Sequence, residues 1–412
     1  MVGAVSRNKK TKKAAKAVDL EIFAGAGGMT LGLQRAGFQF SHVFEIDKHT
    51  CTTLENNHIA KGGMLHGEVH QEDVAKLNWS DFSGPVRLLA GGAPCQPFSL
   101  AGRHLADKDD RNMFPEVLRA VRAVQPQAIM LENVQGLARP SFRPYLEYIL
   151  RQLKWPSIAK KDEEWQDHDR RISQHQTSVN DEPEYYVNWE LLEAADYGVP
   201  QNRRRVFIVA TRANIFQEFE FPPASHKKES LIRIQRNGEY WKSRGIKQPK
   251  KGINGVEVLD LDGFKKFKAW ETVRDAIADL PQPAGSEAAS DDNHWLISGA
   301  RVYRGHTGSR LDWPSKTIKA GVHGVPGGEN IVLVDDGSHR YFTLRETARL
   351  QGFPDDFIFY GARLHVTRQI GNAVPVDLAE AVGRKLFRQI SESFRNEQPR
   401  YTRAHVNRRR KA

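Results

Sequence analysis

The chain has 412 residues, 39% of them hydrophobic, which is long and apolar enough for two or three folded units. No stretch approaches the about 18 consecutive apolar residues of a membrane span. The basic N-terminus is not followed by the apolar segment of a secretory signal. These features predict an intracellular protein without a membrane anchor.

The formal net charge of +11 is concentrated at the two ends of the chain. Residues 1–17 and 400–412 each carry six Lys and Arg and no acid, so 49 of the 61 basic residues remain between them, against 50 acidic ones. We expect disordered basic tails at 1–17 and 396–412. Such tails either add sequence-independent affinity for a polyanion or simply aid solubility.

Short apolar runs alternate with helical patterns in the first half of the chain. Helices are predicted at Met29–Ala36 and Met113–Val124. This alternation predicts an open, mainly parallel α/β sheet, which binds ligands beyond the carboxyl ends of its strands. The predicted strands are Leu20–Phe23, Val43–Ile46, Val86–Ala90, Ala128–Leu131 and Val206–Ala210.

Two regions interrupt this pattern. Residues 154–183 are polar and bracketed by prolines, which predicts an inserted surface loop. From about residue 215 to 343 the alternation is lost, and Lys227–Lys268 holds twelve Lys and Arg against five acids, which indicates a second domain with a basic face. Helical patterning returns at Arg345–Gly352 and Val376–Ile390. We therefore expect a first domain at 18–213, a small domain at 214–367 and a return to the first domain at 368–395.

A glycine-rich turn, Phe23-Ala-Gly-Ala-Gly-Gly28, follows the first predicted strand. Alone, such a turn is by default structural. Glu45 ends the next strand about 20 residues later, where an acid can hydrogen-bond a ribose, so the pair favours a nucleoside-containing cofactor. Asp73 could accept from an adenine amino group or could be an ordinary loop residue. No Lys suits a P-loop, and the G-x-G-x-x-G spacing of a dinucleotide site is incomplete.

The two cysteines form neither a disulfide framework nor a zinc-type spacing. Cys51 fits a small buried hydrophobe. Cys95, in Gly-Gly-Ala-Pro-Cys-Gln-Pro-Phe-Ser after a strand, lies on a shaped loop at the ligand end of the sheet and is a candidate nucleophile. Glu132, at the end of an apolar strand, is either a desolvated general acid or a salt-bridged edge residue. Arg203–Arg205 enter a strand and require anionic or carbonyl partners.

Together these strings resemble the DNA (cytosine-5) methyltransferase family. The matching strings, in the family's order, are FAGAGG, FEID, EDV, APCQPFS, ENV, QNRRR, RETARLQGFPDDF and QIGNAV, over roughly residues 19–213 and 314–390. The resemblance implies a Rossmann-like domain with a mainly parallel sheet that uses S-adenosylmethionine, plus a smaller, irregular target-recognition domain. It implies methyl transfer to C5 of a cytosine flipped out of a specific short double-stranded DNA sequence.

The resemblance also implies roles for individual residues. Cys95 would add to cytosine C6, Glu132 would protonate N3, and Arg203 and Arg205 would position the base and the nucleophile loop, with Arg205 closer to the base. No metal is required, so Asp107–Asp110 is expected to be a solvated loop. The expected S-adenosylmethionine-binding residues are Phe23, Gly25, Gly27, Gly28, Glu45, Ile46, Asp73, Pro94, Asn372 and Val374.

Target recognition is expected around Pro314–Ile318, which resembles the family's threonine-containing segment. For each arginine or histidine taken singly, contact with phosphate or solvent is favoured over a base edge. The candidate DNA-binding residues are Ser99, Arg301, Arg304, His306, Arg310 and Thr317.

Two departures from the family pattern stand out: Glu21 replaces an aspartate common in the family, and the 154–183 segment is longer than usual. The main alternative is a tRNA cytosine-5 methyltransferase of the same family, although its Cys-Phe-Thr element is missing. A non-catalytic DNA-binding protein and a nicotinamide dehydrogenase explain the motifs less well. The expected setting is a monomeric enzyme in the bacterial cytoplasm, bound to the nucleoid, with a companion restriction endonuclease as a candidate functional partner.

Overall fold

The computed structural model describes residues 17–82, 84–94, 112–178, 183–249, 262–285, 293–297, 299–304, 307–320 and 330–397. At its centre is a seven-stranded sheet in the order β3-β2-β1-β4-β5-β7-β6. β7 runs antiparallel to both neighbours and the other pairings are parallel, which confirms the predicted mainly parallel sheet. The strands are β1 (Val18–Ile22), β2 (Phe40–Glu45), β3 (Glu68–Gln71), β4 (Val86–Gly92), β5 (Ala128–Val134), β6 (Tyr185–Glu193) and β7 (Arg204–Arg212).

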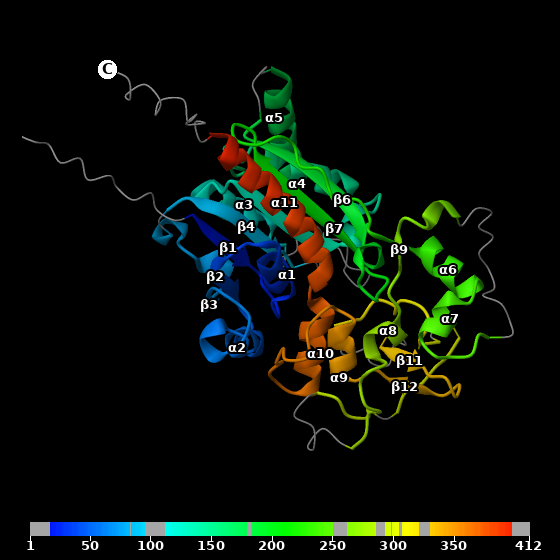
Figure 1. Ribbon diagram of the computed structural model, residues 1–412. Coiled ribbons are helices and arrows are strands. Elements are labelled where there is room, and N and C mark those ends of the chain that lie inside the picture. Colours follow the sequence, from blue (N-terminus) through cyan, green and yellow to red (C-terminus); the bar gives the residue numbers. More distant parts are fainter. Residues whose placement is uncertain are drawn as a thin grey trace, which may run out of the picture.

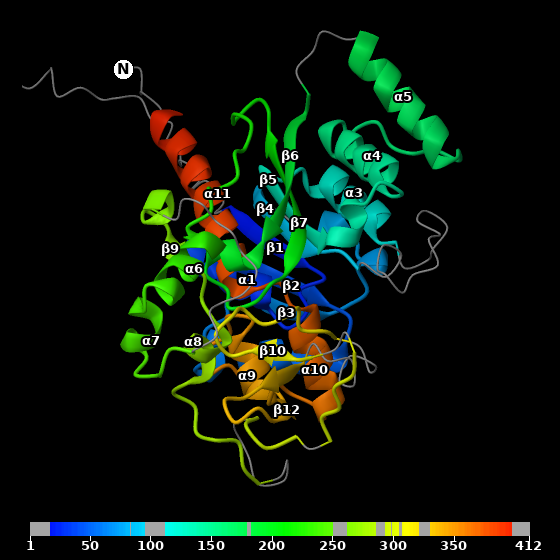
Figure 2. The same cartoon turned by 90° about the vertical axis from the view of Figure 1, so that its right-hand side faces the viewer.

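Helices cover both faces of this sheet (Figures 1 and 2). α1 (Gly28–Ala36) and α11 (Val376–Glu397) lie on one face, and α3 (Phe114–Val124) and α4 (Arg143–Lys154) lie on the other. Residues alternate between two hydrophobic clusters along each buried strand, as the pleat requires: Leu88 and Ala90 face α1 and α11, whereas Leu89 faces α3 and α4. The first domain is therefore a three-layer α/β sandwich.

The contact between α1 and α11 depends on glycine. A β-carbon on Gly32 would lie 2.4 Å from the carbonyl oxygen of Val376 and 2.8 Å from Cβ of Ala379. In the other direction, a β-carbon on Gly383 would lie 2.6 Å from Cδ2 of Leu33. The two helices thus approach more closely than larger side chains would permit. α11, which follows the irregular region in the sequence, therefore packs directly against α1, the first helix of the chain.

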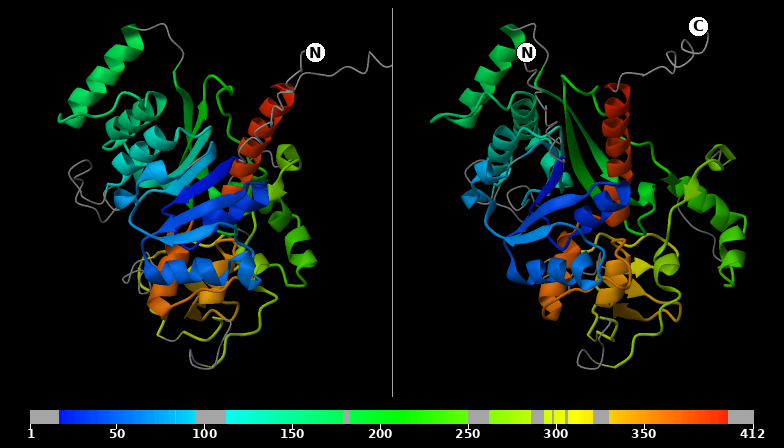
Figure 3. Two further views of the ribbon diagram at one scale, coloured as in Figure 1. Left: turned by 90° about the vertical axis from the view of Figure 1, so that its left-hand side faces the viewer. Right: turned by 60° about the vertical axis from the view of Figure 1, so that its left-hand side comes forward.

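The irregular region between β7 and α11 consists of short elements, drawn in green to orange in Figure 3. Many of its apolar residues, among them Val273, Ile277 and Ile331, belong to the same hydrophobic cluster as Leu33 of α1, so that part of its core is continuous with the core of the first domain. Its elements are β8 (His226–Lys227), α6 (Lys228–Arg236), α7 (Glu239–Ser243), β9 (Lys268–Ala269), α8 (Val273–Ile277), β10 (Ser309–Arg310), β11 (Ile331–Leu333), β12 (His339–Tyr341), α9 (Leu344–Arg349) and α10 (Arg363–Asn372). Leu231, Tyr240 and Trp241 form a separate small cluster at α6 and α7.

The end of this region contacts α2 (Lys48–Asn56), the helix that follows β2. Asn57 donates from Nδ2 to the carbonyl oxygen of Ile358 at 2.7 Å, and Thr53 donates from Oγ1 to Gln369 Oε1 at 2.6 Å. These buried or half-buried bonds fix residues 358–369 against the second α/β unit of the first domain. No helix among the described residues has the length and apolar character needed to cross a membrane.

The segment expected to be an inserted surface loop contains a helix, α5 (Trp165–Ser178), so that part of the prediction was wrong. The helix is polar, and its attachment depends on a few residues. Ile172 is fully buried, and buried His168 contacts the Tyr148 hydroxyl at 2.7 Å and the Ile158 carbonyl at 2.8 Å. Arg151 of α4 forms an ion pair with Asp169 at 2.7 Å. Because these partners come from other segments, the apolar pattern of α5 alone did not reveal the helix.

Glu21 lies on β1 and is buried beneath the glycine-rich turn, next to Thr30 of α1. Burial raises the pKa of its carboxyl from an ordinary value of 4.5 to about 8, an effect that Thr30 partly opposes and the charge of Glu45 strengthens. The side chain is therefore protonated at neutral pH, which makes a carboxyl at this position compatible with the apolar interior.

Replacing Gly32 by alanine should destabilise the protein although alanine is intrinsically the better helix former. The new methyl group meets the backbone of α11, which cannot move as a flexible side chain can, and overpacking of this kind costs about 1–3 kcal/mol. Urea unfolding should show the loss. Gly383→Ala, whose methyl group meets mainly the movable end of Leu33, should lose less. Equal or greater stability of Gly32→Ala than of the wild type would contradict the close helix contact.

Glu21→Gln should change how stability depends on pH. Because the folded state holds the Glu21 proton more tightly than the unfolded state, the wild type should lose stability as the pH rises from about 4.5 to about 8. Glutamine cannot ionise, so the stability of this variant relative to the wild type should increase as the pH rises from about 4.5 to about 8. Urea unfolding at pH 5.5 and 8.5 measures the difference, with Glu55→Gln on the exposed side of α2 as the control. A difference between wild type and Glu21→Gln that is independent of pH would refute the raised pKa.

Candidate functional site

The glycine-rich turn is tied to the acid at the end of β2. The Glu45 carboxylate accepts a hydrogen bond from the Gly25 amide at 2.8 Å on one oxygen, and from the amides of Ile46 and Asp47 at 2.9 and 3.0 Å on the other. A carboxylate offers about four acceptor positions. Three are filled by the backbone, which fixes the orientation of Glu45, and the position left over is on the oxygen that binds Gly25. The carboxylate is therefore held rigidly and can still accept from one hydroxyl group.

The turn itself has a backbone conformation that few side chains favour. Phe23 has a φ of 55° and Gly27 a φ of 84°, and Gly27 is the residue before α1. A left-handed phenylalanine is strained, which is common where a backbone is shaped around a ligand. Ile46, directly after Glu45, exposes 63% of its surface, a large fraction for an isoleucine. An exposed apolar side chain beside a fixed carboxylate suits the base and ribose of a nucleoside.

Asp73 lies past the end of β3, at the same edge of the sheet. One of its oxygens accepts from the Ala75 amide at 3.0 Å, and the other lies 3.9 Å from the Lys76 ammonium. The carboxylate thus begins a short helical turn and keeps acceptor positions toward solvent. Its place in the next strand unit along the sheet from Glu45 matches the expected position for an adenine contact.

The structure brings residues from the far end of the sequence to this turn. A β-carbon on Gly28 would lie 2.3 Å from the carbonyl oxygen of Val374, so a side chain at residue 28 would displace that segment. Val374 is buried and Asn372 is exposed at the end of α10. Pro94 follows β4, the strand that pairs with β1 and places Gly91 opposite Ile22. The cofactor residues expected from the sequence therefore gather around the carboxyl ends of β1, β2 and β4.

Cys95 and Ser99 lie outside the described residues, but the backbone that leads to them is well defined. Gly92 of β4 is the register partner of Glu132 of β5, and a β-carbon on Gly92 would lie 3.4 Å from the Glu132 Oε2. Asn133 donates from Nδ2 to the carbonyl oxygen of Ala93 at 3.2 Å. The segment that carries the cysteine thus starts beside the Glu-Asn-Val motif.

Glu132 is buried and forms an ion pair with Arg205, whose Nε lies 2.7 Å from Oε1. Burial raises the pKa of the Glu132 carboxyl, while the charges of Arg205 and, less strongly, Arg203 oppose that shift. The glutamate is therefore both desolvated and salt-bridged, and its role as a general acid stays a prediction.

Arg203 has a different environment from Arg205. Its side chain is 1% exposed, and the guanidinium donates to the carbonyl oxygens of Ile318, Gly371 and Ala373 at 3.0, 2.7 and 3.1 Å. These carbonyls belong to residue 318 of the irregular region and to the end of α10, just before α11. Arg203 thus joins three parts of the chain next to Glu132, whereas Arg205 contacts the acid itself.

The sequence suggested no individual role for Gln201. Its side chain makes a second set of hydrogen bonds, near Arg203, that links the segment before β7 to the irregular region. The fully buried amide accepts from the Ile318 amide at 2.9 Å and donates to the Leu350 carbonyl at 2.9 Å. Thr317, expected to contact DNA, donates from Oγ1 to the carbonyl oxygen of Asn202 at 2.7 Å. The sequence signal for Gln201 was its place in the Gln-Asn-Arg-Arg-Arg string. Its buried side-chain amide binds the backbone of residues 318 and 350.

The remaining recognition candidates are spread along the surface of the small domain. Arg301, Arg304 and Arg310 are exposed, and Arg310 lies on β10. His306 lies outside the described residues. Exposed arginines can reach a nucleic acid, but their exposure alone does not distinguish a base contact from a phosphate contact.

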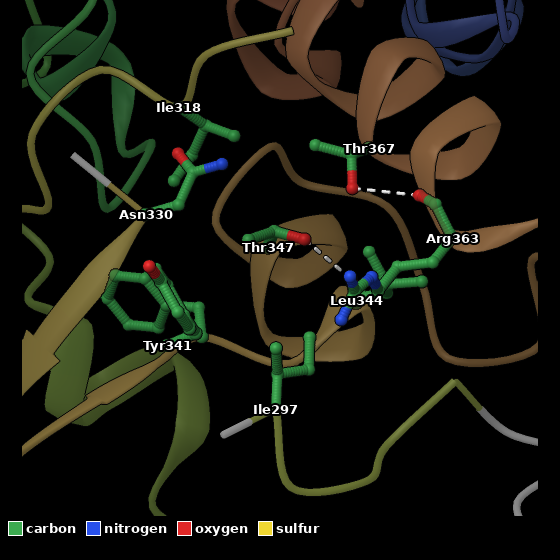
Figure 4. Close-up of a pocket in the computed structure, with 9 residues that line it drawn as sticks. Ile297, Ile318, Asn330, Tyr341, Leu344, Thr347, Arg363 and Thr367 are labelled. Carbon is green, nitrogen blue, oxygen red and sulfur yellow. Dashed lines mark hydrogen bonds between the residues drawn. The ribbon is translucent and has the colours of Figure 1, made fainter. Parts of the chain in front are cut away.

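A small cavity lies deeper in the same region, between the β12 segment, α9 and α10 (Figure 4). Its walls include Ile297, Ile318, Tyr341 and Leu344, and Thr367 donates to the Arg363 carbonyl at its edge at 2.8 Å. None of the residues expected to bind cofactor or cytosine lines it. The cavity is therefore a feature of the packing within the irregular region and is separate from the candidate site.

Comparison with known proteins agrees with this arrangement. A model of the C-5 cytosine-specific DNA methylase family matches residues 18–155 and 164–388. The Type II methyltransferase M.NgoMIV of Neisseria gonorrhoeae is 33% identical over 377 residues, which cover 90% of this chain and 98% of that protein. The Type II methyltransferase M.Eco47II of Escherichia coli is 31% identical over 385 residues, covering 90% of this chain and 79% of that protein.

Solved structures show the same fold at lower sequence identity. The Dnmt2 methyltransferase of S. pombe superposes with a TM-score of 0.53 at 19% identity, covering 92% of this chain and 99% of that one. The family match spans both parts of the sheet domain and the region between them, including the motifs that surround Glu45 and Glu132. The chain therefore belongs to the C-5 cytosine-specific DNA methylases and is a DNA cytosine-5 methyltransferase.

Proposed function

We propose that the protein transfers a methyl group from S-adenosylmethionine to C5 of one cytosine in a specific short double-stranded DNA sequence. The observation that carries this proposal is the buried Glu132–Arg205 pair at the root of the Cys95 segment. An acid, a fixed cation and a nucleophile are the groups that addition to a cytosine ring requires.

The residues around the first turn fit S-adenosylmethionine. Glu45 has an acceptor position for a ribose hydroxyl, exposed Ile46 can pack on adenine, and Asp73 has free acceptor positions toward solvent for the adenine amino group. The absence of a side chain at Gly28 leaves the backbone of Val374 against the turn, so the pocket is closed from both ends of the chain. When bound, the cofactor supplies an electrophilic methyl group on a sulfonium sulfur.

The chain's own residues prepare the cytosine for this transfer. Cys95 adds its sulfur to C6 while Glu132 delivers a proton to N3, so the electron pair of the C5–C6 double bond becomes available at C5. C5 would then take the methyl group that bound S-adenosylmethionine supplies. Loss of the C5 proton to a base, departure of the Cys95 thiolate from C6 and return of the N3 proton to Glu132 restore the neutral aromatic ring. The atoms and charges balance without a metal or an oxidant.

Arg205 and Arg203 set the geometry of this step in different ways. Arg205 holds Glu132 in place and faces the same space, so we assign it to the flipped base as well. Arg203 acts as a positioning residue, because its donors are used by backbone carbonyls of the flanking segments. Flipping costs a few kcal/mol of lost stacking and pairing, which contacts from the Cys95 segment and the small domain must supply. We assign those contacts to exposed Arg301, Arg304 and Arg310, and to Ser99 and His306.

The biological setting follows from the relatives. Both relatives described above are named Type II methyltransferases, so we propose that this enzyme acts on bacterial DNA and protects it from a companion restriction endonuclease. We also propose that it works as a monomer. The basic tails add affinity for DNA through the release of counterions.

The direct test is methylation of unmethylated genomic DNA by the purified protein, read by bisulfite sequencing, with tRNA assayed in parallel. We expect 5-methylcytosine in one short recurring DNA context. Cys95→Ser should abolish the product while S-adenosylmethionine binding, measured by calorimetry, persists. Cys51→Ser is the matched control and should remain active, because Cys51 is buried in α2 and burial raises the pKa of its thiol to about 12. Methylation by Cys95→Ser, or methylation of tRNA alone, would overturn the proposal.

Glu132→Gln should lower kcat by about 10²–10⁴-fold, the range that general acid catalysis contributes, with DNA binding retained. Wild-type kcat should fall as the pH rises through the raised pKa of Glu132, since the protonated acid is the active form, and Glu132→Gln should lack that limb. Rates from pH 6 to 9 and fluorescence anisotropy with duplex DNA measure both effects. Glu190→Gln, on the exposed edge strand β6, is the control. Loss of DNA binding with kcat unchanged would show that Glu132 has another role.

A further inference from the structure

Two histidines and a glutamate meet at the β2–β3 edge of the sheet, a part of the molecule that methyl transfer does not use. The parallel pairing places His42 opposite Glu68 and Phe44 opposite His70. Since alternate residues of a strand share a face, all four side chains lie on the face of the sheet that carries the Phe44 cluster. Glu68 and His70 come from the short edge strand β3, and His42 comes from β2 (Figure 1).

The three donor atoms lie at distances close to those around a metal ion. His42 Nδ1 and His70 Nε2 are 2.9 Å apart, and Glu68 Oε2 lies 3.8 Å from the first and 3.9 Å from the second. A tetrahedral ion bound at about 2.0–2.2 Å keeps its ligands about 3.3 Å from one another. Small side-chain rotations, which widen the imidazole pair and draw in the glutamate, bring all three to that spacing.

The surroundings hold the imidazole rings in place. The His70 ring stacks on Phe44 with centroids 4.8 Å apart and an angle of 19°, and the edge of Phe82 packs against His42 with centroids 5.3 Å apart. Phe44 packs in turn against Trp79. Aromatic rings cover one side of the two imidazoles, and the other side is open to solvent. The two ring nitrogens face Glu68, whose side chain is 71% exposed. The open side leaves room for a water molecule as a fourth ligand.

We propose that His42, Glu68 and His70 bind a divalent transition metal ion of the Zn²⁺ class, in a site separate from the methyl-transfer centre. Two imidazoles and one carboxylate are a ligand set that zinc favours, and a set poor in oxygen is unsuited to Mg²⁺ or Ca²⁺. The competing explanation is a hydrogen bond between two imidazoles with Glu68 nearby by chance. That bond needs one unprotonated ring nitrogen, which is also the form that a metal takes up.

A metal ion at this place would act as a clamp on the edge of the sheet. β3 has four residues and pairs with β2 alone, and it leads directly to Glu72 and Asp73. An ion shared between the two strands would tie β3 to β2 three residues before Glu45. The edge, and with it the position of Asp73, would then become more resistant to local opening. This role does not depend on whether the protein methylates DNA.

The test uses the full-length protein after dialysis against a chelator, with Zn²⁺ titrated in a calorimeter and Co²⁺ followed by its visible absorption. We expect one saturable ion at this site and a rise in Tm with Zn²⁺. His42→Gln and His70→Gln should each weaken the affinity at least about tenfold and remove the rise in Tm, by analogy with the loss when a metal's supporting groups are removed. His66→Gln is the control, because it removes a nearby histidine and leaves the cluster intact.

Glu68→Ala guards against variants that fail to fold, because this exposed side chain contributes little to the packing of the metal-free protein. It should keep the Tm of the metal-free wild type and lose at least about tenfold in Zn²⁺ affinity. The proposal is overturned if the wild type shows no saturable binding at micromolar Zn²⁺. It is also overturned if Glu68→Ala, or both folded histidine variants, bind the ion as the wild type does.

Discussion

A buried guanidinium at the start of β7 is the interaction on which the rest of the site depends. Arg203 is almost completely enclosed, and its donors meet carbonyl oxygens from residue 318 on one side and from residues 371 and 373 on the other. A charge taken out of water is tolerated when its donors are satisfied, and each hydrogen bond to a charged group contributes about 1.5–3 kcal/mol. The recognition region and the C-terminal segment are therefore held to the sheet at one point.

That point is two residues from the acid pair, so assembly and chemistry are coupled. Arg205 lies two residues after Arg203, within β7, and is the register partner of Val134, which places its guanidinium on Glu132. Desolvation raises the pKa of Glu132 and the two arginines oppose the rise. Movement of the irregular region that displaces Arg203 would therefore also change the electrostatic field at the Glu132 carboxyl. Gln201 and Thr317 strengthen this coupling, because both bridge the strand β7 entry and the recognition region.

Much of this arrangement could be predicted from the sequence, because the relevant signals are local. The predicted strands are central ones whose apolar runs are continuous, and Glu45 and Glu132 each end such a run. β3 and β6 escaped prediction because they are edge strands with polar, half-exposed residues. α5 was missed because its packing depends on partners from other segments, His168 on Tyr148 and Asp169 on Arg151.

Other properties depend on distant contacts and could not be predicted at all. The sequence shows that Arg203 needs partners, but it does not show that they are backbone carbonyls more than a hundred residues away. The same holds for Glu21, whose longer side chain was noted while its burial was not. His42, Glu68 and His70 have no recognisable metal-binding spacing, because the pairing of two strands and not the order along the chain brings them together.

The contact between Gly28 and the Val374 backbone also has a consequence for the order in which the protein acquires its properties during translation. The glycine-rich turn leaves the ribosome early, but the wall that closes its pocket is made by a segment near the end of the chain, and α11 covers α1 later still. A nascent chain can therefore expose most of its recognition region before it can hold a cofactor. On the proposed mechanism, a chain that stops before residue 374 carries Glu132 and Cys95 but lacks the segment that completes the S-adenosylmethionine pocket, so the ability to modify DNA is acquired late in synthesis.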